Sequence, residues 1–293
     1  SAERYAAVLA LADDEELDAS TRFAAGMGAA QALQRSGDPR AAADTFADLD
    51  APDPAAERWR LQQHASALMA ADELDDALAI WRALEALAAE DPTVLATALL
   101  GQGTALVALD RSPEALPLLA RAESLSTDPA SQGWASLARA GALHESGDSD
   151  GALAVLLMLV DHPDPEVQLQ SRIRRAQAFS AQERWTDALA ELAEVGFGAL
   201  GPGWDATVAE TRAAAWIGSG DREQAREEWK HLVRTWPDEE EAQLPAWLGL
   251  AALAAVDGQD DQALALANQA LSKTQDPAYR AQAEALIRDL RMR

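Results

Sequence analysis

Apolar residues recur every three or four positions along most of the chain, in stretches separated by short polar turns. One stretch carries Leu137, Ala140 and Leu143, and the stretch after the next turn carries Leu153 and Leu156. This spacing places the apolar side chains on one stripe of an α-helix. The pattern therefore predicts amphipathic helices from near the beginning of the chain to near its end.

The turns between these stretches recur at a nearly constant interval. An alanine stands five residues after the first residue of each turn, and the spacings between successive alanines are 35, 38, 37, 36, 37 and 38 residues. Gly or Asp in the turn, as in Gly220-Asp221, can end one helix and cap the next. The sequence predicts about seven helix pairs, in which a small residue allows two helices to cross closely. The anchor alanines are Ala42, Ala77, Ala115, Ala152, Ala188, Ala225 and Ala263.

The repeating unit resembles the tetratricopeptide repeat, which has a small residue in its first helix, a turn with Gly, an Ala at the crossing, a bulky apolar residue and a closing Pro. The sixth unit carries the resemblance most fully, through Ala213, Trp216, Gly220, Ala225, Trp229 and Pro237. The resemblance covers roughly residues 20–277 and implies an all-α fold, a right-handed superhelical α-solenoid of antiparallel helix pairs. The family repeat has about 34 residues, so longer helices or loops are expected here. Pro117 is expected to shorten or distort its helix.

Five segments are expected along the chain. Residues 1–19 are predicted to form an N-terminal flanking helix, 20–195 repeats 1–5, and 196–206 a Gly-rich connector. Repeats 6–7 are expected at 207–277 and a C-terminal capping helix at 278–293. Four glycines in the connector predict a flexible bend, at which the array can divide into two lobes.

Composition and charge exclude several classes of function. With 48% hydrophobic residues the chain can build a core, and it is too apolar for a disordered acidic tail. The net charge of -25 repels phosphate backbones and anionic lipids, so no nucleic-acid partner is expected. No apolar run approaches the ~18 residues that span a bilayer, so direct membrane insertion is not expected either.

The sequence shows no pattern of catalytic or ligand-binding residues. The chain has no cysteine, and its four histidines lie in different repeats without ligand spacing. The glycines of residues 196–203 lack the Lys and Ser or Thr that a phosphate-binding loop requires. We therefore expect no catalytic residue, no cofactor and no metal site.

The resemblance implies that the first helices of successive repeats line a concave face. The side chains expected there are mostly uncharged, which suits a peptide or helix held by hydrogen bonds; the alternative is that they are ordinary solvent-exposed side chains. These residues are Gln31, Gln34, Arg35, Gln62, Ser66, Met69, Thr97, Thr104, Trp134, His144, Gln170, Gln177 and Ile217. Both lysines lie outside first helices, which opposes a clamp for acidic peptide tails.

Nine tryptophans stand out in a chain with few aromatic residues. Trp81, Trp216 and Trp229 fall at positions that pack between helices and are predicted to be core. We expect the exposed candidates, which could anchor a partner, to be Trp59, Trp134 and Trp204.

These observations favour a non-catalytic scaffold or adaptor that binds a partner peptide or helix in the concave groove. Its expected setting is a bacterial cell-envelope complex, because Ser1 in place of a start Met suggests a trimmed leader. A periplasmic location is expected, with the cytoplasm as the alternative. A second hypothesis is a peptide-sensing or regulatory domain excised from a larger signalling protein, and a third is a hidden enzyme. The sequence gives no indication of oligomeric state.

Overall fold

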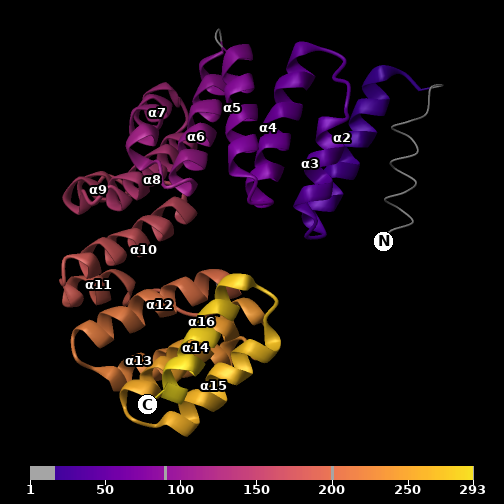
Figure 1. The fold of residues 1–293 in the computed structure, drawn as a ribbon. Coiled ribbons are helices and arrows are strands. Elements are labelled where there is room, and N and C mark those ends of the chain that lie inside the picture. Colours follow the sequence, from indigo (N-terminus) through magenta and orange to yellow (C-terminus); the bar gives the residue numbers. More distant parts are fainter. Residues whose placement is uncertain (1–16, 89–90, 199–200, 293) are drawn as a thin grey trace. The chain divides into compact units, whose positions relative to one another are not determined.

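The computed structural model describes residues 17–88, 91–198 and 201–292, and all regular elements in these ranges are α-helices (Figure 1). The flanking helix expected within residues 1–19 lies mostly outside the described residues, so that expectation stays a prediction. The helices form pairs, in each of which a first helix is followed by a short turn and a second helix.

The first helices all have the same length of 17 residues. They are α2 (Ala19–Arg35), α4 (Pro54–Ala70), α6 (Pro92–Ala108), α8 (Pro129–Glu145), α10 (Pro165–Ala181), α12 (Pro202–Gly218) and α14 (Glu240–Val256). Most begin with Pro, whose missing amide hydrogen costs nothing in the first turn. Asp53, Asp91 and Asp128 precede three of them and accept amide hydrogens there.

The second helices vary from 8 to 14 residues. They are α3 (Pro39–Ala47), α5 (Leu74–Leu87), α7 (Ser112–Leu125), α9 (Ser149–Leu157), α11 (Trp185–Leu192), α13 (Arg222–Thr235) and α15 (Asp260–Lys273). Helix α7 continues through Pro117 and keeps the 14-residue length of α5, so the expected shortening is wrong. Because the first helix and its turn are constant, the variation in repeat length lies in the second helices and the loops after them.

Each turn between a first and a second helix contains one residue with left-handed backbone angles. The next residue then donates its amide hydrogen to a carbonyl five residues earlier, as Asp221 does to Trp216 at 2.8 Å. This hydrogen bond closes the end of the first helix. The seven left-handed residues are Gly37, Asp72, Asp110, Gly147, Glu183, Gly220 and Gly258.

Replacing Glu183 with glycine is expected to stabilise the fold by about 1 kcal/mol, because a residue with a Cβ is strained at its φ of 58°. Urea unfolding followed by tryptophan fluorescence measures the change. Gly220→Ala, at the same position of the next turn with φ 90°, is the matched control and should destabilise the fold by about 1 kcal/mol. Equal stability of both variants and the parent would contradict this account of the turn.

The contacts divide the chain into two units, residues 1–168 and 169–293, which are described separately. The boundary lies within α10, upstream of the connector expected at 196–206. In the N-terminal unit, α2 to α9 pack one after another in sequence order (Figure 1). In the C-terminal unit, α11 to α15 continue the same order, and α16 (Pro277–Met292) follows.

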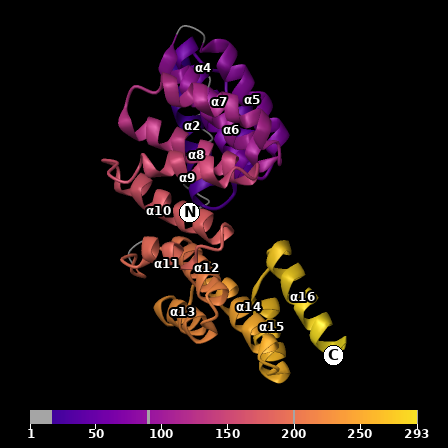
Figure 2. The ribbon, with the colours of Figure 1, turned by 90° about the vertical axis from the view of Figure 1, so that its left-hand side faces the viewer.

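The last helix, α16, occupies the place of a first helix. It begins 37 residues after α14, starts with Pro, and packs against α15 and α14 (Figure 2). It therefore continues the repeat and covers α15, at the position where the sequence predicted a capping helix.

The anchor alanines pack as the sequence predicted, because all seven have at most 1% of their surface exposed. Large and small residues complement each other where helices meet. A Cβ added to Gly101 would lie 2.3 Å from the Trp81 ring, and one on Gly249 would lie 2.4 Å from Trp229. These glycines let the indoles lie directly against the backbone of the next first helix.

The structure agrees with three of the six tryptophan predictions. Trp81 and Trp229 are each only 6% exposed, whereas Trp59 is 42% exposed. Trp216, predicted to be core, is half-buried. The two other candidates for exposure, Trp134 and Trp204, are half-buried as well.

The described part of the Gly-rich connector is tied to α12. Asp205 is fully buried and accepts hydrogen bonds from the Gly198 amide and from Trp236 Nε1, the latter at 2.7 Å. Arg212 donates to the Val195 carbonyl at 3.0 Å. Residues 196–198 are thus held by hydrogen bonds in this structure, and the flexible connector stays a prediction.

Arg212 is also one half of a largely buried ion pair. Its Nε lies 3.5 Å from Glu228 Oε2, and its guanidinium lies 4.7 Å from the centre of the Phe197 ring. Burial lowers the pKa of Arg212 and raises the pKa of Glu228. Both directions show that loss of water outweighs the attraction between the two charges.

Candidate functional site

All thirteen residues expected on the partner-binding face lie on first helices. Counted from the first residue of each helix, they stand at positions 6, 9, 13, 16 or 17. These positions are three or four residues apart and share one face of a helix. We call this set of positions the first-helix face. By helix, its predicted members are Gln31, Gln34 and Arg35 on α2; Gln62, Ser66 and Met69 on α4; Thr97 and Thr104 on α6; Trp134 and His144 on α8; Gln170 and Gln177 on α10; and Ile217 on α12.

The exposure of these side chains differs. Gln170 is buried, with 8% of its surface exposed, and seven others are half-buried. Met69 and Trp134 pack against core clusters, so they support the fold as well. Five predicted residues are exposed to solvent: Arg35, Ser66, Thr104, Gln177 and Ile217.

The polar groups of the first-helix face make few contacts with neighbouring helices. The hydroxyls of Ser66, Thr97 and Thr104 donate to carbonyls of their own helices at 2.9 to 3.0 Å. Nδ1 of His144 is buried and has no hydrogen-bond partner among the described residues. Across helices, no hydrogen bond joins two of the thirteen within the described ranges. These hydroxyls thus bond within their own helices and do not join the face to neighbouring helices.

Trp59 occupies position 6 of α4, the position that Trp134 occupies on α8, although it is not one of the thirteen predicted residues. Its ring meets Phe23 of α2 edge-on, with 6.0 Å between the centroids. Trp59 is therefore an exposed indole held by a neighbouring helix, a type of side chain that is enriched at protein interfaces.

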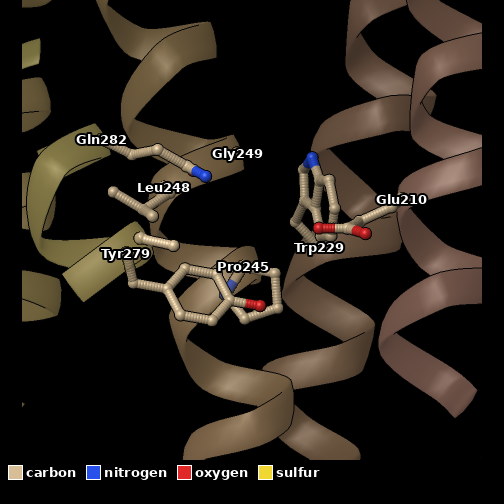
Figure 3. A pocket seen from close by; sticks show the side chains of 8 residues that line it. Glu210, Trp229, Pro245, Leu248, Gly249, Tyr279 and Gln282 are labelled. Carbon is tan, nitrogen blue, oxygen red and sulfur yellow. The ribbon is translucent and has the colours of Figure 1, made fainter. Parts of the chain in front are cut away.

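The C-terminal unit contains a pocket of about 500 Å³ on the same face (Figure 3). Glu210 and Leu248 stand at position 9 of their helices, and Pro245 and Gln282 stand at position 6. None of the thirteen predicted residues lines the pocket. The helix positions used to place Ile217 on α12 also apply to α14 and α16. Applied to those two helices, they would have identified the pocket. The lining residues are Glu210, Trp229, Pro245, Leu248, Gly249, Ala278, Tyr279 and Gln282.

The pocket combines apolar walls with one carboxylate. The Glu210 carboxylate, the Tyr279 hydroxyl and the Gln282 amide all point toward its centre (Figure 3). The surrounding walls withdraw water from Glu210 and raise its pKa. Burial, together with the charges of Glu210, Asp276 and Glu241, raises the pKa of Tyr279. The Tyr279 hydroxyl therefore keeps its proton at neutral pH and can donate a hydrogen bond.

Neither a metal site nor a membrane span emerges from the described ranges. Within them, no group of three or more His, Asp or Glu side chains is arranged to hold a metal ion. None of the helices there is both long and apolar enough to cross a bilayer.

The comparisons with known proteins agree with the repeat seen in the structure. Residues 118–245 match the family described as the tetratricopeptide repeat-like domain. No curated protein is significantly similar to the chain.

Several solved structures share the fold over 92% of this chain. A tetratricopeptide repeat protein from Parabacteroides merdae ATCC 43184 is 11% identical, with a TM-score of 0.66 and 99% of its own chain covered. A signal transduction ATPase with a tetratricopeptide repeat sensor, from Pyrococcus horikoshii, is 14% identical, with a TM-score of 0.64 and 44% covered. The human IFIT1 dimer with m7Gppp-AAAA is 14% identical, with a TM-score of 0.63 and 64% covered. The chain spans less than two thirds of the latter two proteins.

At such low identity these structures bear on the fold alone, and they describe the same architecture as the repeats seen here. Residues 118–245 thus resemble the tetratricopeptide repeat-like domain, and the described residues form an all-α array of helix pairs with the fold of tetratricopeptide repeat proteins.

Proposed function

We propose that this protein is a non-catalytic scaffold or adaptor that binds a partner polypeptide along its first-helix face. The observation that carries the proposal is the common register of that face on first helices of identical length. Side chains such as Thr104 and Gln177 recur there at fixed spacing and are exposed. Amides and hydroxyls suit hydrogen bonding to a peptide backbone, and they offer little acid–base chemistry.

The proposed setting of this scaffold is the assembly of a bacterial cell-envelope complex. A second candidate is a peptide-sensing or regulatory domain of a larger signalling protein. The likeness to the Pyrococcus horikoshii protein favours it, because that protein carries a tetratricopeptide repeat sensor and is longer than this chain. Both candidates use the same face for binding.

Selection of phage-displayed random peptides on the immobilised full chain tests the proposal. We expect peptides that bind with Kd values of about 1–100 μM, the range of modest peptide interfaces. Trp59→Ala in the N-terminal unit or Gln177→Ala in the C-terminal unit should weaken each selected peptide about fivefold or more, since truncating a contact residue costs about 1 kcal/mol or more.

The matched controls are Arg82→Ala on α5 and Asp261→Ala on α15, which change exposed second-helix residues. Fluorescence anisotropy of the labelled peptides should give unchanged Kd values for both. The proposal fails if no peptide is selected. It also fails if the second-helix variants lose binding while the first-helix variants keep it.

A further inference from the structure

The pocket of the C-terminal unit has walls suited to an extended side chain. Trp229, Pro245 and Tyr279 present ring surfaces, and Leu248 adds an aliphatic group (Figure 3). Gly249 has no side chain, which leaves the Trp229 indole against the backbone of α14. Pro245 also has no amide hydrogen, so the Glu241 carbonyl lacks its usual helical donor. Apolar ring surfaces beside hydrogen-bond acceptors are the environment that the alkyl stem and charged head of Arg or Lys require.

Among the described residues that line the pocket, Glu210 carries the only charge. At positions 6, 9, 13 and 16 of α12, α14 and α16 stand the carboxylates Glu210 and Asp289 and no basic residue. Arg280 follows Tyr279 on α16 and contacts groups outside the pocket. It lies 3.7 Å from Glu284 and donates to the Thr274 carbonyl at 3.3 Å.

Glu210 makes no ion pair or hydrogen bond with the other described residues, and part of its surface is exposed. The walls of the pocket still reduce its hydration, which raises its pKa. A carboxylate in this position gains more from an incoming cation than a fully hydrated carboxylate does.

We infer that this pocket binds the side chain of an arginine or lysine of the partner polypeptide, with Glu210 as its counter-ion. The guanidinium or ammonium group meets the Glu210 carboxylate, and the alkyl stem lies against the rings of Trp229, Pro245 and Tyr279. The inference rests on the proposed function. It further specifies that the partner polypeptide carries an arginine or lysine at the position that enters this pocket.

Glu210→Gln separates binding from folding. Because the folded-state pKa of Glu210 is raised, its ionised form contributes an unfavourable free energy to folding at neutral pH, and that contribution disappears as the pH falls below this pKa. Neutralising the carboxylate should therefore leave Tm unchanged or slightly higher.

The test uses phage-displayed random peptides selected on the immobilised full chain. Among peptides that compete for this pocket, we expect Arg or Lys at one fixed position. Replacing it with citrulline or norleucine in the synthetic peptide should weaken binding about tenfold, which is typical of a lost hydrogen bond between charged groups. The Glu210→Gln variant should bind the selected peptide and its substituted form equally well. The Glu210→Lys variant should select peptides with Asp or Glu at that position. Glu240→Gln, an exposed carboxylate in the same unit, should keep the parent's preference.

The outcomes separate this inference from the proposed function. If peptides bind through the first-helix face without a cationic preference, or if Glu210→Gln retains that preference, the inference is wrong and the proposed function stands. If no peptide binds, both are wrong. If methylguanidinium or butylamine alone binds as tightly as the peptide, the pocket holds a small cation and the assignment to a partner side chain is overturned.

Discussion

Replacing Arg212 with methionine is expected to lower the free energy of unfolding by about 3 kcal/mol, because it leaves the Glu228 carboxylate largely buried without its counter-ion. Only 14% of the Arg212 side chain and 19% of the Glu228 side chain are exposed. The substitution also removes the hydrogen bond to the Val195 carbonyl and the contact with the Phe197 ring. Urea unfolding followed by tryptophan fluorescence measures the loss.

The double variant Arg212→Met/Glu228→Leu is the control for this prediction. Nε of Arg212 and Oε2 of Glu228 make no hydrogen bond with each other, so the ion pair is poorly compensated for its lost hydration. Replacing both charges with apolar groups should recover most of the stability that the single variant loses. If the double variant loses as much free energy of unfolding as the two single variants lose together, the ion pair is not the cause.

The loss in Arg212→Met should depend on pH. Burial already raises the pKa of Glu228 above its ordinary value, and removing Arg212 removes a charge that lowers this pKa. In the variant, the folded state therefore binds a proton at Glu228 more readily than the unfolded state does, and stability rises as the pH falls through the raised pKa. The difference between variant and parent should shrink on acidification, and a constant difference would argue against a buried charge.

The periodic part of the fold could be predicted from the sequence because it depends on local chemistry. The spacings between the anchor alanines, 35 to 38 residues, equal those between the starts of successive first helices. Gly in four of the seven turns marks the left-handed residue, which only glycine adopts without strain. Where Asp72, Asp110 and Glu183 replace glycine, the turn keeps its geometry because the packing on both sides determines it.

The connector shows contacts that local chemistry does not predict. Four glycines in residues 196–203 are typical of a flexible segment. Asp205 and Arg212, on the following helix, hold its described part through contacts that span 7 and 17 residues of sequence. Neither residue belongs to a recognisable motif, so composition could not reveal the tie.

The register of the first-helix face could be predicted from the sequence, but the pocket in the C-terminal unit could not. The choice of polar first-helix residues identified positions such as those of Thr104 and Gln177, which are exposed. The pocket depends on Gly249 allowing Trp229 to lie against α14, and on α16 providing the far wall. Such cooperation among four helices is a property of packing, which hydrophobic periodicity does not encode.

Asp205→Ala is expected to destabilise the C-terminal unit by about 2 kcal/mol, because it leaves the Gly198 amide and Trp236 Nε1 without their acceptor. Asp205 is fully buried, and its second oxygen, Oδ1, has no partner among the described residues. The alanine variant no longer has to bury this carboxylate, and the free energy saved offsets part of the loss of the two hydrogen bonds. The free energy of unfolding in urea gives the net change.

Asp205→Asn distinguishes the role of shape from that of charge. Its amide oxygen can still accept a hydrogen bond, so the loss should be about half of that in Asp205→Ala. Hydrogen exchange at Gly198 should accelerate more in the alanine variant than in the asparagine variant, because that amide then exchanges without opening a bond to Asp205. Unchanged exchange at Gly198 in Asp205→Ala would mean that α12 does not hold the connector. A graded response would show that one buried carboxylate determines the path of a glycine-rich segment whose composition predicts flexibility.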